Sequence, residues 1–437
     1  MKKLLLVGLA LATLSGCSDQ DNLQVNIPLE EETNATELLC SNVPIRFADV
    51  EAGDFIDGGI TRGIAGETID YPGLGLFCLG KRSINDGITE GRKPSWSGKS
   101  SALINSYSLW RNNIPISLRY YVDKKQSKVL WDTDMYGSNA PYYPDKDYFA
   151  YGFVLYYPRT ENIVKTQTSI TAYIKLDGSK RVFYSMAKQP KTVLNNDIDK
   201  LGFSKSYYQA IDPEPGVEEW IYPYFTFQQL TSGIKFALYS KEEPNTKLHV
   251  EKIEFDNFPC IMKLGLATMQ RYADKTPYDM KSNIAKNPFI LNDSVYDANN
   301  LSQFPDMPSW LGHFELYEEN GEPIAGQKNP DGSYKYTLTK DTLPIGGTIY
   351  IPPVYASHSK ANPKVHITIA DEAGNKYKTS SAITLNAPIH GWQRGYSYTY
   401  KLYLNNPAEV ITNAEVANWT VTSFDVNATT TKWVEEP

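Results

Sequence analysis

Short runs of aromatic and β-branched residues, separated by turn-forming residues, constrain the fold of this chain more than any other feature. Three examples are SLRYYV (residues 117–122), FAYGFVLYY (149–157) and SYTYKLYL (397–404), in which apolar and polar residues roughly alternate. This pattern is typical of half-buried antiparallel strands. No long apolar pattern of period 3.6 appears, so the sequence predicts an all-β fold.

Turn signals lie between these runs, for example Asp177-Gly178 and Asn329-Pro330-Asp331-Gly332. Many short strands with such punctuation favour antiparallel β-sandwiches over βαβ units. The 437 residues also exceed what a single hydrophobic core usually organises, which predicts two domains.

A weak internal echo suggests where the domains divide. YYPRTENIVKTQTSITAYIKLDGSKRVFYS (156–185) and YIPPVYASHSKANPKVHITIADEAGNKYKTS (350–380) share an order of Pro, connection, strand, turn and strand. Each is followed by an apolar strand, SGIKFALYS (232–240) and RGYSYTYKLYL (394–404). Two related sandwiches would produce this echo, and so would two ordinary hairpins. The first alternative places the boundary in KEEPN (241–245), with β-sandwiches at 41–243 and 244–437.

The N-terminus has the layout of a secretory signal. An apolar run of residues 4–14 follows Lys2 and Lys3 and is shorter than the roughly 20 residues of a membrane-spanning helix. Cys17, preceded by Leu-Ser-Gly, resembles the lipobox of bacterial lipoproteins, which implies acylation of its thiol. We therefore expect a signal and lipobox at 1–17, and an acidic tether at 18–40.

The residues SDQD (18–21) resemble the acidic tag that directs some lipoproteins to the outer face of the Gram-negative outer membrane. The expected location is therefore the cell outer membrane, with the body exposed at the surface and lipid chains holding the protein there.

The search for chemistry finds no enzymatic signature. The formal net charge is −7 and no basic run is present, which argues against nucleic acid as a partner. The five histidines form no HExxH motif, and no GxSxG elbow occurs. We expect no catalytic residue, no cofactor and no metal. A glycosidase carboxylate pair has no sequence signature, so a surface hydrolase stays an alternative.

Three cysteines remain after Cys17, an odd and sparse set that allows at most one disulfide. Cys78 and Cys260 lie among apolar residues, and we expect them to be buried as small hydrophobic side chains. The sequence leaves open whether either of them, or Cys40, forms a bridge.

The C-terminal region carries a resemblance to a known family. RGYSYTYKLYL followed by ITNAEVANWTVTSFDVNATTTKW (411–433) resembles the closing pattern of the fimbrillin family, which comprises subunits of type V pili and minor-fimbrillin-like lipoproteins. Further similar segments are VPIRFADVE (43–51), ITRGIAG (60–66), YYPDKDYFAYGFVLYYP (142–158) and LHVEKIEFDNFPCIMKLGLA (248–267).

The resemblance implies two transthyretin-like β-sandwiches in tandem and assembly by strand exchange after a protease cuts behind an arginine. Arg62 lies in a Gly-rich segment that a protease can reach, whereas Arg46 lies in a strand-like run and is the less favoured site. The tail NWTVTSFDVNATTTKWV (418–434) would serve either as a donor strand or as the last strand of its own domain.

These inferences lead to a non-enzymatic surface lipoprotein, a pilus subunit or accessory adhesin. The implied partners are other pilus subunits, the outer membrane and a host or bacterial surface ligand. A glycan-binding lipoprotein of a nutrient-uptake system is the alternative, because abundant Tyr and Trp side chains can stack on sugars as well as pack across strands.

Overall fold

The structure is a computed structural model of the chain. It describes residues 40–47, 50–51, 68–81, 109–121, 126–131, 142–144, 150–165, 169–187, 203, 207–208, 222–240, 247–268, 311–353, 363–379, 382–385, 391–404, 415–416 and 419–428.

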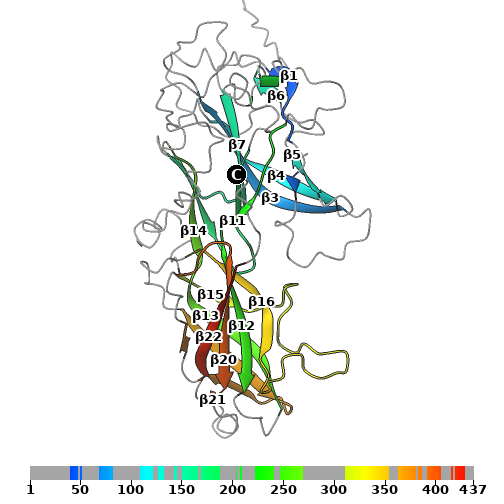
Figure 1. The fold of residues 1–437 in the computed structure, drawn as a ribbon, viewed down its shortest axis with the longest axis vertical. Helices are drawn as coiled ribbons and strands as arrows, with labels where there is room; N and C mark the ends of the chain where they lie inside the picture. Colours follow the sequence, from blue (N-terminus) through cyan, green and yellow to red (C-terminus); the bar gives the residue numbers. More distant parts are fainter. Residues whose placement is uncertain are drawn as a thin grey trace, which may run out of the picture.

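A seven-stranded antiparallel sheet forms the centre of the N-terminal half (Figure 1). Its strand order is β11-β10-β7-β3-β4-β5-β2. The bounds are β2 (Val50–Glu51), β3 (Thr68–Lys81), β4 (Leu109–Tyr121), β5 (Gln126–Trp131), β7 (Ala150–Tyr157), β10 (Phe183–Met186) and β11 (Gln228–Gln229).

Two smaller sheets lie beside it. One has the order β14-β9-β8, and the other is the pair β1-β6. Their bounds are β1 (Cys40–Pro44), β6 (Tyr142–Pro144), β8 (Ile163–Lys165), β9 (Ser169–Lys175) and β14 (Ile261–Thr268).

The large sheet is buried on both faces, as the alternation in β7 makes clear. Val154 and Tyr156 belong to a core shared with β9 and β14, whereas Phe153 and Leu155 belong to a second core on the opposite face. Successive strand residues point to opposite faces, so a fully apolar strand such as this one needs cover on both sides.

Two further sheets form a sandwich in the C-terminal half. The first has the order β16-β12-β20-β22, and the second has the order β15-β13-β17-β18-β21 with β19 paired to β17. The bounds are β12 (Ser232–Ser240), β13 (Leu248–Pro259), β15 (Leu311–Glu315), β16 (Leu343–Ile351), β17 (Lys364–Asp371), β18 (Lys376–Thr379), β19 (Ile383–Thr384), β20 (Tyr396–Leu404), β21 (Glu415–Val416) and β22 (Trp419–Ala428).

The core of this sandwich lies between β12 and β20 on one side and β13 and β17 on the other. Phe236 of β12 lies 4.7 Å from Phe255 of β13, measured between ring centroids. Trp392 is fully buried and donates its indole N–H to the Tyr400 hydroxyl at 3.0 Å, so this core polar group is satisfied.

The prediction of an all-β sandwich fold is confirmed. Most strand pairs are antiparallel, and two pairs, β12–β20 and β18–β21, are parallel. Tyr207 and Tyr208 have helical backbone geometry. In the part of the chain described here, no helix has the length and apolar character needed to cross a membrane.

The position of β12 differs from the sequence-based expectation. We expected SGIKFALYS to close the first sandwich, but β12 pairs with β16 and runs parallel to β20, from Gly233↔Ser397 to Ser240↔Leu404. The two copies of the echo also differ, because β17 and β18 pair whereas β9 and β10 lie in different sheets. We keep a division into two units as a proposal and assign β12 to the second unit.

A continuous stretch of backbone and several backbone hydrogen bonds connect the two halves of the molecule. β13 passes into β14 through Cys260 alone, and the Cys260 carbonyl accepts a hydrogen bond from the Leu176 N–H at 2.7 Å. Gly178 lies at this junction, where its carbonyl accepts from the Tyr350 N–H at 2.7 Å. A Cβ at Gly178 would lie 3.1 Å from Ile349 Cγ2, so the turn depends on glycine.

Gly178→Ala tests this junction. The substitution places a side chain at φ +87° and against Ile349, so we expect the free energy of unfolding to fall by about 2 kcal/mol. Gly374→Ala is the matched control, because Gly374 has φ +84° and no atom lies within 4 Å of the position that a Cβ would take there. That control should lose about 1 kcal/mol, from backbone strain alone. Equal losses in urea unfolding would show that the contact with Ile349 is unimportant.

Candidate functional site

The second core of the N-terminal half is an apolar face of the large sheet. β3, β4 and β7 contribute a continuous set of buried side chains to it, namely Leu74, Leu76, Cys78, Ile114, Ile116, Leu118, Phe153 and Leu155. Because no large sheet packs on this face among the described strands, other segments must cover it.

Aromatic side chains supply much of the cover. They are Tyr143, Phe203, Tyr207, Tyr208, Phe225 and Phe227, all buried. Phe153 of β7 lies 5.9 Å from Phe203, and Tyr207 lies 4.9 Å from Tyr208 in an edge-on arrangement. Contacts of this kind each contribute about 0.5–1.5 kcal/mol beyond buried area. We call this layer, together with the sheet face beneath it, the aromatic face.

Burial keeps Tyr207 and Tyr208 of the aromatic face neutral. Removal from water raises the pKa of Tyr207 and raises that of Tyr208 well above its usual value. The hydroxyls of Tyr143 and Tyr208 lie 3.3 Å apart and share a hydrogen bond. This layer therefore behaves as apolar cover with an internal polar contact, and its buried phenols are poorly suited to acid–base chemistry.

The N-terminal segment completes the cover. Ile45 is fully buried, and the Trp131 indole N–H donates to its carbonyl at 3.2 Å. The Phe47 ring lies 5.5 Å from Trp131, 5.1 Å from Phe153 and 5.1 Å from Phe225. Ile45 thus inserts into the aromatic face, and the partly buried Phe47 packs against the same face.

Backbone pairing holds this segment at both ends. β1 pairs with β6, with Cys40 opposite Pro144, and β2 pairs with β5 at the edge of the large sheet, with Val50 opposite Ser127. Both β1 and β2 are short and add few ladder bonds. The side chains of Ile45 and Phe47, which lie between these two strands, therefore supply much of the attachment of the segment to the body.

Arg46 lies between the two inserted side chains and is exposed. Its Nη1 donates to the Tyr222 hydroxyl at 3.4 Å. We expected Arg46 inside a strand, but residues 45–47 lie between β1 and β2 and belong to neither. Arg62 and Cys17 lie outside the described residues, so their roles stay predictions.

Sequence reasoning missed the part played by Phe47, Trp131 and Phe225. The available signal is the i, i+2 spacing of Ile45 and Phe47 around a charged residue, which places both apolar side chains on one side of an extended chain. Nothing local in the sequence identifies Trp131 and Phe225 as their partners.

The C-terminal strand β22 pairs with β20 over its whole length, from Tyr396↔Ala428 to Leu404↔Trp419. It ends the sheet order, so it is an edge strand attached through one ladder. Of the two roles considered for the tail, the described part has the position of a last strand of its own unit. Residues 429–437 lie outside the described part of the chain.

Cys78 and Cys260 are both buried, as expected. Burial raises the pKa of the Cys260 thiol to about 11, which keeps it protonated and unreactive. Among the described residues, no group of three His, Cys, Asp or Glu side chains could hold a metal ion.

Comparison with protein-family models gives no match, and comparison with curated proteins gives none either. Comparison with solved structures does find similar chains. A putative cell adhesion protein from Bacteroides uniformis shares 11% sequence identity, with a TM-score of 0.35, and the match covers 89% of this chain and 98% of that one.

Two fimbrial proteins from Porphyromonas gingivalis are also similar. The fimbrial anchor protein Mfa2 shares 8% identity over 88% of this chain and 96% of its own, with a TM-score of 0.26. The tip fimbrial protein Mfa3, with a C-terminal truncation, shares 10% over 83% and 98%, with a TM-score of 0.27. These neighbours are of the adhesion and fimbrial type.

Phe47→Ala tests the attachment of the N-terminal segment. Loss of three ring contacts should lower the free energy of unfolding by about 3 kcal/mol and speed tryptic cleavage after Arg46. Tyr317→Ala is the control, because Tyr317 is 43% exposed and its loss should change stability by less than about 0.5 kcal/mol. Thermal unfolding and N-terminal sequencing of the digest measure both effects. Unchanged cleavage in Phe47→Ala would show that the segment is held elsewhere.

Proposed function

We propose that this protein is a non-enzymatic cell-surface lipoprotein of the fimbrial type, a pilus subunit or accessory adhesin. In this proposal residues 40–51 cover the aromatic face until they are exchanged for a strand of another subunit. The insertion of Ile45 and Phe47 into that face is the observation that carries the proposal. The resemblance of the sequence to fimbrillins supports it.

Residues 40–51 are attached in a way that would allow a strand of another subunit to replace them. Two short ladders and two inserted side chains hold it, so no large sheet has to unfold when it leaves. Its departure would expose Trp131, Phe153 and Phe225 to water together with the free edge of β5. An exposed apolar face beside an unpaired strand edge is a template for a strand from another chain.

The position of a cut decides how much of the segment leaves. A cut after Arg62 would release β1, Ile45, Phe47 and β2 in one piece. A cut after Arg46 would release β1 and Ile45 but leave Phe47 joined to the body through β2. Arg62 therefore remains the better candidate for opening the whole face, although Arg46 is exposed.

The donor in this proposal is the C-terminal strand. β22 lies at the edge of its sheet among the described strands, so its departure breaks one described ladder, the one with β20. Deletion of residues 420–437 should block donation. It should also weaken the second unit, because β20 then loses a partner along its whole length.

Limited digestion with a trypsin-like protease tests the exchange. Chains cut after Arg62 should form oligomers in gel filtration, because the opened face pairs with a second chain. Arg62→Ala should remain monomeric under the same conditions, whereas Arg46→Ala should still form oligomers. N-terminal sequencing identifies the cut in each case.

A synthetic peptide of residues 40–51 provides the control for mechanism. It should suppress oligomers of the cut protein by refilling the aromatic face, whereas the same peptide carrying Ile45→Asp and Phe47→Asp should not. Cut protein that stays monomeric with its own segment bound would rule out a polymerising subunit.

Cys17→Ala tests whether a lipid on this residue anchors the protein to the outer membrane. Without the cysteine thiol the precursor cannot be acylated, and we expect the protein to leave the outer-membrane fraction. Cys78→Ala is the control, because that thiol is buried in the body of the protein and should not affect membrane attachment. Membrane fractionation with immunodetection measures the result, and unchanged fractionation of Cys17→Ala would contradict lipid anchoring there.

A further inference from the structure

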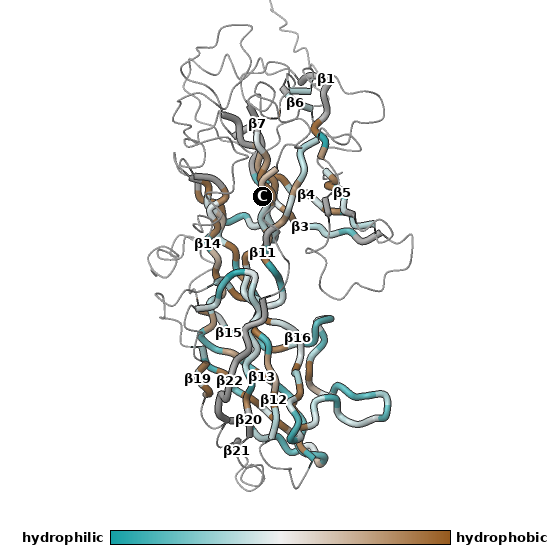
Figure 2. The backbone as a smooth tube through the Cα atoms, viewed as in Figure 1, coloured by the Kyte–Doolittle hydropathy of each residue, from teal (hydrophilic) through white to brown (hydrophobic). Residues whose placement is uncertain are grey.

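A hydrophilic excursion leaves the C-terminal sandwich between β15 and β16. It comprises residues 316–342. Its hydrophilic part projects from the side of the body (Figure 2), whereas Leu316, Ile324, Tyr336 and Leu338 belong to the core of the sandwich. Two tight turns shape it, closed by the hydrogen bonds from Gly321 N–H to the Glu318 carbonyl at 2.9 Å and from Gly332 N–H to the Asn329 carbonyl at 2.9 Å.

The excursion is fixed to the body. The His249 ring, buried on β13, stacks on Tyr334 with 3.6 Å between centroids, and Lys328 lies 5.0 Å from the same tyrosine ring centroid. Val250 donates its N–H to the Tyr336 carbonyl at 3.0 Å. The excursion is therefore a preorganised part of the surface.

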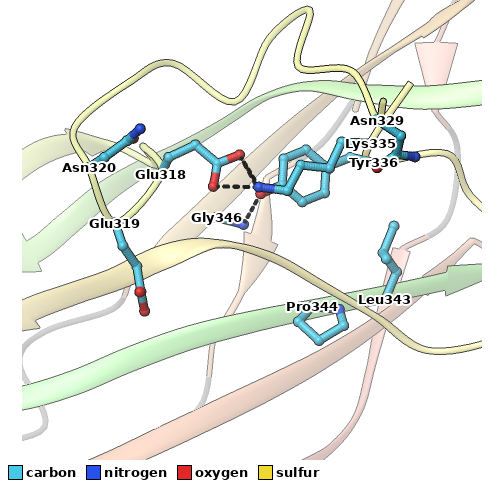
Figure 3. Close-up of a pocket in the computed structure, with 9 residues that line it drawn as sticks. All are labelled: Glu318, Glu319, Asn320, Asn329, Lys335, Tyr336, Leu343, Pro344 and Gly346. Atoms are coloured by element: carbon cyan, nitrogen blue, oxygen red, sulfur yellow. Dashed lines mark hydrogen bonds and ion pairs between the residues drawn. The ribbon is translucent and has the colours of Figure 1, made fainter. Parts of the chain in front are cut away.

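A surface depression of about 560 Å³, open to solvent on one side and here called the cavity, lies between the first turn and β16. Its lining consists of Glu318, Glu319, Asn320, Asn329, Lys335, Tyr336, Leu343, Pro344 and Gly346 (Figure 3). This volume is within the range of roughly 300–1,000 Å³ that is usual for small-molecule sites.

Two glycines in β16 allow the turn to approach. Gly346 has φ +62°, and a Cβ there would lie 2.8 Å from the Leu316 side chain. A Cβ at Gly347 would lie 3.0 Å from the Glu319 N atom, while the Gly347 N–H donates to the Tyr317 carbonyl at 2.7 Å. Glycine inside a strand marks such close approaches. These two glycines therefore allow the first turn to pack against β16 and form one wall of the cavity.

A hydrogen-bond network orients the polar groups at the floor. The Glu318 carboxylate accepts from Lys335 Nζ at 2.8 and 2.9 Å and from the Tyr336 hydroxyl at 2.5 Å (Figure 3). The Tyr336 hydroxyl in turn accepts from the Gly346 N–H at 3.2 Å. The hydrogen bond from Lys335 to Glu318 raises the pKa of Lys335, and burial raises that of Tyr336, so the ammonium stays charged and the phenol stays protonated.

The lining fits one chemical class of ligand. Glu319 is exposed and offers acceptors, whereas Glu318 and Lys335 bond to each other and offer only their remaining lone pairs and N–H groups. Asn320 Oδ1 accepts from the Glu322 N–H at 3.1 Å and Asn329 Nδ2 donates to Ser333 Oγ at 3.0 Å, so each amide offers its other groups. This mixture suits a ligand whose hydroxyls donate and accept. Leu343 and Pro344 form an apolar wall for C–H groups. Lys335 balances the charge of Glu318, and Glu319 adds a negative charge that disfavours anions.

We propose that this cavity binds a neutral saccharide, as the terminal unit of a surface glycan. The site lies in the half of the molecule opposite to β1 and β6 (Figure 1). It does not depend on strand exchange, and its failure would leave the proposed assembly untouched.

Binding of the full-length chain, purified in detergent with its lipid, to an array of mono- to tetrasaccharides tests this. We expect signal on neutral and N-acetylated saccharides and little on sialylated or sulfated ones. Titration calorimetry with the saccharide that gives the strongest signal then compares variants. Glu318→Gln and Glu319→Ala should each weaken binding about tenfold or more, as expected when a hydrogen bond to a charged group is lost.

Glu322→Ala is the matched control. Glu322 lies on the same turn as Glu319 and is exposed, but it does not line the cavity, so its loss should leave affinity within about twofold. Thermal unfolding confirms that each variant is folded. The proposal is overturned by absence of array binding, by binding confined to anionic saccharides, or by equal losses in Glu319→Ala and Glu322→Ala.

Discussion

One nearly continuous stretch of extended chain, from β13 through Cys260 to β14, fixes how the molecule is arranged. β13 pairs with β15 and β17 in the C-terminal sandwich, and β14 pairs with β9 in the N-terminal half. The core of the C-terminal sandwich and the core between the large sheet and β14 therefore both include residues of this one stretch. Tyr173 of β9 and Ile261 of β14 belong to the C-terminal core cluster, so apolar packing continues across the junction. Reorientation of one half against the other would break this packing together with the hydrogen bonds of Gly178 and Cys260.

This arrangement explains why the large sheet needs the N-terminal segment as cover. The large sheet uses one face against β9 and β14, and those strands are held by the junction. Its other face has no comparable sheet among the described strands, and loops and residues 45–47 cover it. Because the chain covers this face itself, the apolar surface beneath residues 45–47 and the β5 edge paired with β2 are not presented to other molecules.

Local sequence patterns predicted strands, turns and buried residues correctly where these depend on residues close together in the chain. FAYGFVLYY forms strand β7 as predicted, but its side chains are buried on both faces of the sheet and not on one face only. The Asn329–Gly332 turn and the Asp177-Gly178 turn both form, with positive φ at Gly178 and Gly332. The burial of Cys78 and Cys260 also follows from their apolar neighbours.

Partners distant in sequence could not be predicted in this way. SGIKFALYS reads as an apolar strand, but nothing in it specifies parallel pairing with β20, more than a hundred residues away. Burial at Trp131 and Phe225 likewise depends on a segment near the N-terminus. The Gly346-Gly347 pair inside PIGGTIYI was a usable local signal for the cavity, because two glycines in a strand suggest close backbone approach.

The two edges of the sheet β16-β12-β20-β22 are not equivalent. Along β16, outward N–H groups of Gly347 and Tyr350 already bond to the carbonyls of Tyr317 and Gly178. β22 ends the described sheet on the other side. Within the described residues, other segments of the chain therefore already bond to part of the β16 edge, whereas β22 is the last strand on the opposite edge.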